Sequence, residues 1–210
     1  MGWGIILFCV ILYIWQSGLD HRQEVQLIYG FGFIPAVFFD QLSLGPQFAI
    51  LPSEITALTS IFLHGGAWHL IGNMLFLYIF GDNIEDACGH WRFVAFFLAT
   101  GFAASLAHGF AAAGSDVPLV GASGAISGIL GAYLLLRPTA RITALLPFFV
   151  PVRLPVWAWI SGWFIYQTVA SGGLIGQENV AYMAHIGGFI AGLALFPLCK
   201  RREARLFQRD

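Results

Sequence analysis

The chain has 210 residues and a net charge of −1, and 58% of its residues are hydrophobic but only 10% charged. Soluble domains usually have about 45–50% apolar and about 25% charged residues, so this composition is typical of a protein with several membrane spans. The charge gives no indication of a nucleic-acid surface. The three cysteines, Cys9, Cys88 and Cys199, have no metal-ligand spacing, and their odd number argues against a disulfide framework.

The first apolar stretch, residues 3–15, is short for a membrane span. At about 1.5 Å per residue it covers roughly 20 Å, against a hydrocarbon core of about 30 Å. A signal peptide is the alternative, but the stretch lacks a basic n-region and a clear small-residue cleavage site. We interpret residues 1–16 as a first span, and leave open whether a natural N-terminal extension is missing.

The next segment, residues 17–66, is too long for a turn and mixes aromatic residues with prolines and glycines. An ordered segment of this length is usually functional or partly helical. Short amphipathic helices at the outer interface would suit it, and a simple cover over the bundle is the alternative.

Five further stretches approach the roughly 20 apolar residues that a spanning helix needs. They are residues 67–80, 93–113, 117–136, 156–170 and 180–198. With the first stretch they predict an all-α integral membrane protein with six transmembrane helices in one domain, 1–210. Spans two to six lie in residues 67–198, and residues 199–210 form a basic tail.

The basic residues orient these spans, because lysine and arginine accumulate on the cytoplasmic side. Six spans put both termini on one side, together with the connections after the second and fourth spans. Of the ten lysine and arginine residues, only Arg22 falls on the other side. We therefore expect a multi-pass protein with both termini in the cytoplasm, in the inner (plasma) membrane of a bacterium.

Four polar side chains fall at one depth on the three spans that run inward. Counted from the outer ends at about 1.5 Å per residue, Ser123, His185, His69 and Asn73 all lie within the outer ~10 Å of the hydrocarbon layer. Polar groups in a membrane are costly and normally face the bundle interior or a wet cavity. We therefore expect these four to converge.

Each polar residue also has a structural explanation. A serine in a spanning helix usually bonds back to a carbonyl one turn earlier, a histidine is often structural, and Asn73 could join two helices. The shared depth favours a site over these explanations, but Ser127, one turn after Ser123, keeps the structural one.

Spans four and six each carry a small-xxx-small pattern, which lets helix backbones approach closely. The glycines lie just inward of Ser123 and His185, and they are Gly124, Gly128, Gly188 and Gly192. They predict contact between these two spans.

A serine and a histidine at one level point to acyl-transfer chemistry, because a serine hydroxyl becomes a strong nucleophile when a base takes its proton. Histidine, with an ordinary pKa of about 6.5, can act as that base. No carboxylate lies at this depth, and Asp116, just outside the fourth span, is the nearest acid. We therefore expect a dyad, with Asp116 as the alternative third member. We also expect a helix break near Gly121, and gating of access by the loop 17–66 or by residues 171–179.

The motifs Gly121-Ala122-Ser123-Gly124, Ala184-His185-Ile186-Gly187-Gly188 and His64-Gly-Gly-Ala-Trp-His69-Leu-Ile-Gly-Asn73 resemble those of the rhomboid family of intramembrane serine proteases. The likeness covers nearly all of the chain after about residue 55. The turn after the second span matches as well, at Gly81, Glu85, Gly89 and Arg92.

The resemblance implies a rhomboid-like bundle with a long first outer loop, which cleaves transmembrane segments of other proteins in the bilayer without metal or cofactor. It implies Ser123 as nucleophile, His185 as general base, and Asn73, His69 and the Ser123 N–H as oxyanion donors. His64 corresponds to a structural histidine. This chain lacks the Trp-Arg pair of the first outer loop, and it has Ser127 where some members carry an aromatic residue against which the histidine packs.

Two other function classes compete with a protease. A rhomboid-like protein that binds transmembrane helices without cutting them is the first, and the intact Ser123 and His185 argue against it. A small transporter would need acidic residues along a pore, and the spans have almost none. A metalloprotease is disfavoured, because no HExxH motif occurs. His90 and His108 have no partners by spacing.

Overall fold

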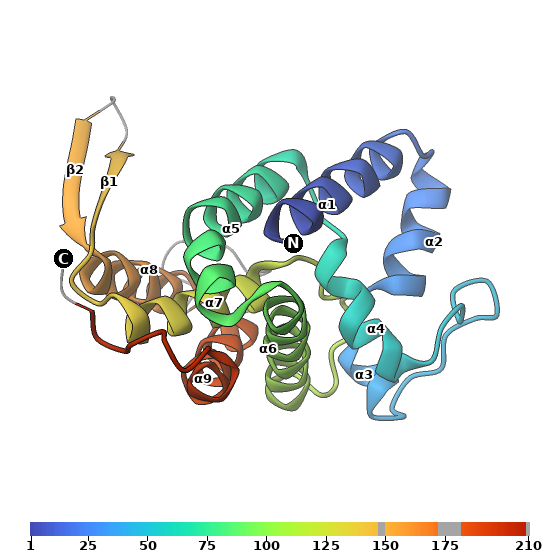
Figure 1. Cartoon of the computed structure of the whole chain (residues 1–210). Coiled ribbons are helices and arrows are strands. Elements are labelled where there is room, and N and C mark those ends of the chain that lie inside the picture. Colours follow the sequence, from blue (N-terminus) through green and yellow to red (C-terminus); the bar gives the residue numbers. More distant parts are fainter. Residues whose placement is uncertain (147–149, 172–181, 209–210) are drawn as a thin grey trace.

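The computed structural model describes residues 1–146, 150–171 and 182–208 and is mainly helical (Figure 1). The helices are α1 (Gly2–Ser17), α2 (His21–Phe31), α3 (Pro35–Phe38), α4 (Ser53–Thr59), the 3-10 turn η1 (Ser60–Phe62), α5 (Ala67–Cys88), α6 (His90–Ala111), α7 (Ser123–Leu136), α8 (Val156–Ser171) and α9 (Tyr182–Cys199). Beyond Ser171, the expected gating segment 171–179 lies outside the described residues.

Two of the described helices, α6 and α9, are long and apolar enough to cross a membrane. The apolar helices α1 and α7 have only 16 and 14 residues, and at about 1.5 Å per residue α7 is roughly 21 Å long. Helix α5 has 22 residues but carries three acidic residues in its last two turns. The count of six spans therefore remains a prediction.

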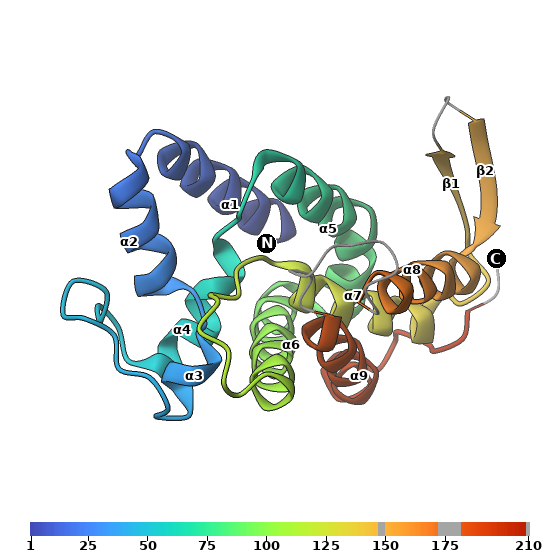
Figure 2. The ribbon, with the colours of Figure 1, turned by 180° about the vertical axis from the view of Figure 1, so that it is seen from behind.

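The long segment between α1 and α5 is partly helical, as expected. Its helix α2 begins with a capping box, in which the Asp20 carboxylate accepts from the Gln23 N–H and the Gln23 side chain accepts from the Asp20 N–H. An antiparallel bridge between Phe33 and Leu119 ties this segment to the chain that leads into α7. In both views, α2–α4 lie at the opposite end of the molecule from the hairpin (Figure 2).

A two-stranded hairpin between α7 and α8 was not predicted. Strands β1 (Arg141–Leu146) and β2 (Val150–Pro155) pair antiparallel, from Arg141 opposite Pro155 to Leu146 opposite Val150. The hairpin projects from the helices (Figure 1). Its sequence is rich in β-branched and apolar residues, which favour strands, but it is short enough to be taken for a connection between two spans.

Helices α6, α7 and α9 pack closely through glycine and other small residues. A Cβ added at Gly188 would lie 2.0 Å from the Gly124 carbonyl oxygen, and one added at Gly192 would lie 2.1 Å from that of Gly128. A Cβ at Gly124 would lie 2.5 Å from that of Ala104 in α6. The predicted contact between the fourth and sixth spans is confirmed.

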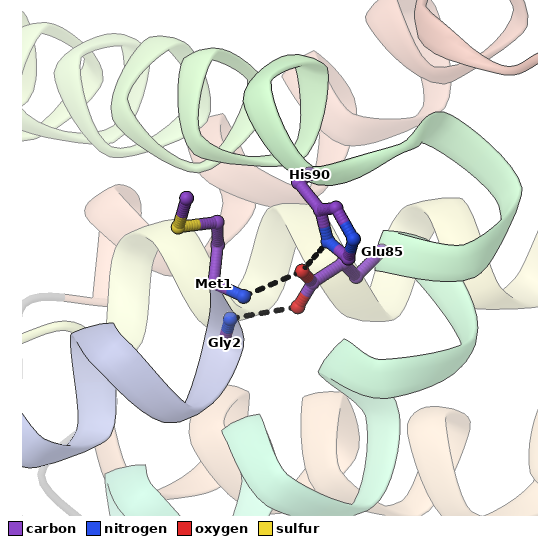
Figure 3. Close-up of polar contacts among 4 residues, drawn as sticks. All are labelled: Met1, Gly2, Glu85 and His90. Atoms are coloured by element: carbon purple, nitrogen blue, oxygen red, sulfur yellow. Dashed lines mark hydrogen bonds and ion pairs between the residues drawn. The ribbon is translucent and has the colours of Figure 1, made fainter.

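The start of α1 is fixed to the turn between α5 and α6 by the buried Glu85 carboxylate (Figure 3). Its Oε2 accepts from the Gly2 N–H at 2.7 Å, and its Oε1 accepts from the Met1 ammonium at 2.6 Å. His90 Nδ1 contacts the same oxygen, so His90 has a partner, contrary to the prediction from spacing. These donors compensate a carboxylate that burial alone would destabilise.

We expect Gly188→Ala to lower the free energy of unfolding by about 1–3 kcal/mol, because the new methyl group would overlap the Gly124 backbone, which cannot rotate away. In a chain of this size that loss lowers Tm by about 2–4 °C per kcal/mol. Thermal unfolding in detergent measures it.

The matched control is Gly162→Ala on α8, where nothing lies within 4 Å of the added Cβ. It should leave Tm unchanged or raise it slightly, since alanine favours a helix more than glycine by up to about 1 kcal/mol. Equal Tm values for the two variants would contradict the close contact of α7 and α9.

Candidate active site

Ser123 is the first residue of α7, because the residues immediately before it are not helical. Gly121 has φ +127°, a conformation that favours glycine, and its N–H donates to the Ser60 carbonyl at 2.9 Å. The expected break near Gly121 is confirmed. The expected helix from residue 117 is wrong, since Pro118, the bridge at Leu119 and Gly121 keep residues 117–122 out of the helix.

The structure brings Ser123 and His185 into hydrogen-bonding contact. The Ser123 Oγ and the His185 Nε2 are 2.7 Å apart, although the two residues are 62 positions apart in the chain. His185 is buried, near the start of α9 and one turn before Gly188, the residue that contacts Gly124. The hydroxyl can therefore donate to an imidazole nitrogen that is held by a fixed helix pair.

His69 and Asn73 approach the same helix start from α5. A Cβ built on Gly121 would lie 2.8 Å from the His69 Nε2 and 3.6 Å from the Asn73 Nδ2. The Asn73 amide nitrogen is buried and has no hydrogen-bond partner among the described residues. All four predicted site residues thus lie around the N-terminus of α7, whose first N–H groups have no partners within the helix.

The second ring nitrogen of His185, Nδ1, has no hydrogen-bond partner within the described part of the chain. Asp116, the nearest acid in the sequence, is exposed and does not reach it. Among the described residues, Ser123 and His185 thus pair through Nε2, with no acid on the second ring nitrogen.

His64 lies next to the site and packs against one of its residues. Its ring is fully buried and packs edge-on against His69, with ring centroids 5.4 Å apart. Its backbone carbonyl accepts a hydrogen bond from Gln16 of α1 at 2.9 Å. Burial lowers the pKa of His64 to about 4, the neighbouring His69 lowers it as well, and a bond to the Phe62 carbonyl acts in the opposite direction. His64 is therefore neutral at neutral pH.

Ser127 has the structural role that was expected, since its hydroxyl donates to the Ser123 carbonyl at 2.7 Å. The sequence reasoning missed one neighbour of the site: Trp163 of α8 packs against His185, with ring centroids 5.2 Å apart and planes inclined by 47°. Because position 127 carries no aromatic residue, a ring from another part of the chain could be expected to pack against His185.

The described residues contain no group of three or more His, Cys, Asp or Glu side chains that could hold a metal ion. The arrangement brings together a serine hydroxyl, an imidazole nitrogen and several groups able to donate hydrogen bonds at one helix start.

Comparison with known proteins gives the same assignment over most of the chain. Residues 53–202 match the model of the rhomboid domain. The chain is 33% identical to rhomboid protein 1 of Saccharomyces cerevisiae, a mitochondrial protein, over 67% of this chain and 40% of that protein. It is 30% identical to the mitochondrial RHOMBOID-like protein 12 of Arabidopsis thaliana, over 91% of this chain and 62% of that protein.

A human relative, the mitochondrial presenilin-associated rhomboid-like protein, is 28% identical over 65% of this chain and 35% of its own length. The chain thus spans less than two thirds of the length of these three relatives. The match to the rhomboid domain covers more than half of the chain, including all four residues of the candidate site. The chain belongs to the rhomboid family of membrane proteins.

Proposed function

We propose that this protein is an intramembrane serine endopeptidase that hydrolyses peptide bonds in transmembrane segments of other membrane proteins. The observation that carries the proposal is the 2.7 Å contact between the Ser123 Oγ and the His185 Nε2 at a buried helix start. This contact is the one that transfer of the hydroxyl proton to the imidazole requires.

In the proposed reaction, the Ser123 hydroxyl attacks the scissile carbonyl while His185 Nε2 takes its proton. The oxyanion of the tetrahedral intermediate accepts hydrogen bonds from the Ser123 N–H, the Asn73 amide and the His69 ring. The positive end of the α7 dipole adds to this stabilisation. His185 then gives the proton to the leaving amine, and a water molecule, activated by the same base, hydrolyses the acyl-enzyme.

The site lies at the N-terminal ends of α5, α7 and α9, and the basic residues collect near the other ends of these helices. This supports a site near the outer face of the bilayer with both termini on the cytoplasmic side. The names of the relatives place those proteins in mitochondria or chloroplasts, so they do not favour a bacterial plasma membrane for this chain.

A fluorophosphonate probe should label Ser123 in the detergent-solubilised protein, because the dyad activates this hydroxyl without a bound substrate. His185→Ala should abolish the labelling, since general-base assistance is worth about 10²–10⁴ in rate. Mass spectrometry of the adduct locates the site. Absence of label, together with no cleavage of any transmembrane test substrate, would favour a helix-binding protein without catalysis.

Asn73→Ala should lower kcat by about 10²–10³ with little change in KM, because the lost amide donor acts on the oxyanion and not on the bound substrate. The matched control is Asn83→Ala, at the other end of α5, near Arg137 and the C-terminal tail. Steady-state cleavage of a transmembrane test substrate measures both variants. Unchanged turnover in Asn73→Ala would remove Asn73 from the oxyanion site.

A further inference from the structure

We propose that Trp163 of α8 is a positioning residue for His185: its indole holds the imidazole in the orientation from which Nε2 accepts the Ser123 proton. The inference rests on the proposed function. The observation is the ring contact, with centroids 5.2 Å apart and planes inclined by 47°.

His185 needs such support because few polar groups restrain it. Its Nε2 contacts Ser123 Oγ, but its Nδ1 has no hydrogen-bond partner among the described residues. In serine–histidine–aspartate triads, a carboxylate on that nitrogen fixes the orientation of the ring. One hydrogen bond fixes the position of one ring atom but leaves the ring free to turn about it, so the remaining restraint must come from packing.

The position one turn after the nucleophile cannot provide that packing in this chain. Ser127 is fully buried in α7, and its short side chain is occupied by the bond to the Ser123 carbonyl. An aromatic ring therefore reaches His185 from a different helix.

Trp163 packs against its neighbour Phe164, which makes a second aromatic contact between α8 and α9. Its ring lies 4.9 Å, edge-on, from that of the adjacent Phe164, and Phe164 lies 4.7 Å, edge-on, from Phe189. Phe189 follows His185 by one turn of α9. Two neighbouring rings of α8 thus engage two successive turns of α9, which defines where the indole stands relative to the imidazole.

Apart from these rings, α8 packs on α7 and α9 far less extensively than α6 and α7 pack on α9. The orientation of the base therefore depends on the least firmly attached helix that contacts it. When α8 is docked, the imidazole is aligned, and a displacement of α8 would remove the indole and leave the imidazole free to turn.

The test compares Trp163→Phe, which keeps a ring, with Trp163→Leu, which keeps apolar bulk without one. The control is Trp157→Leu, on the same helix, with a side chain that is 53% exposed and makes no ring contact to the site. For each protein we would measure Tm, the rate of fluorophosphonate labelling at Ser123, and kcat and KM for a transmembrane test substrate.

We expect Trp163→Leu to slow labelling and kcat by the same factor, roughly three- to tenfold, as for loss of an aromatic pair that holds the reactive geometry. KM should be unchanged, Trp163→Phe should recover most of the rate, and Trp157→Leu should match the wild type. A merely structural role would lower Tm without slowing the labelling of the folded fraction.

Equal labelling rates for the Leu and Phe variants, or an effect on KM or Tm alone, would overturn the role of Trp163. If the wild-type protein is labelled and Trp163→Leu is labelled and fully active as well, this inference alone is refuted. Wild-type protein that is not labelled at all refutes the proposed function instead.

Discussion

The contact between the α7 and α9 backbones at Gly124 and Gly188 is the constraint on which the site depends. Because a Cβ at Gly188 would lie 2.0 Å from the Gly124 carbonyl, the two helices are as close as their main chains allow. Ser123 directly precedes Gly124, and His185 precedes Gly188 by one turn. Fixing the glycines in contact therefore fixes the backbone positions from which the Ser123 and His185 side chains reach their 2.7 Å contact.

A second constraint on the site is the backbone conformation of Gly121. The left-handed backbone at Gly121 lets α7 start at Ser123, so that the first N–H groups of the helix, which lack partners within it, lie at the candidate site. The missing side chain at Gly121 leaves room for His69, whose ring a Cβ there would overlap at 2.6 Å. One glycine thus provides both the helix start and the access of α5 to it.

The periphery is built differently from this core. Buried Glu85 joins the start of α1 to the α5–α6 turn through three donors, and Gln16 joins its other end to His64 beside the site. Helix α8, in contrast, is attached by the buried Val156 and Ile160 in its first half and by aromatic rings next to His185. In the proposed mechanism, α5 and α7 carry the donors and the nucleophile, and α8 carries the ring that would orient the base.

The sequence by itself determined the membrane class, the long apolar helices and the pairing of the glycine patterns, and it predicted that Ser123, His185, His69 and Asn73 converge. These follow from composition and from the fixed rise of a helix, which are local properties. It also predicted the break at Gly121, because glycine tolerates that backbone. Only the tertiary structure decided that α7 starts at Ser123, that residues 141–146 pair with residues 150–155, and that His90 meets Glu85 and Trp163 meets His185. These features depend on the relative orientation and packing of separate elements. The periodicity within a single segment of the sequence does not encode that packing.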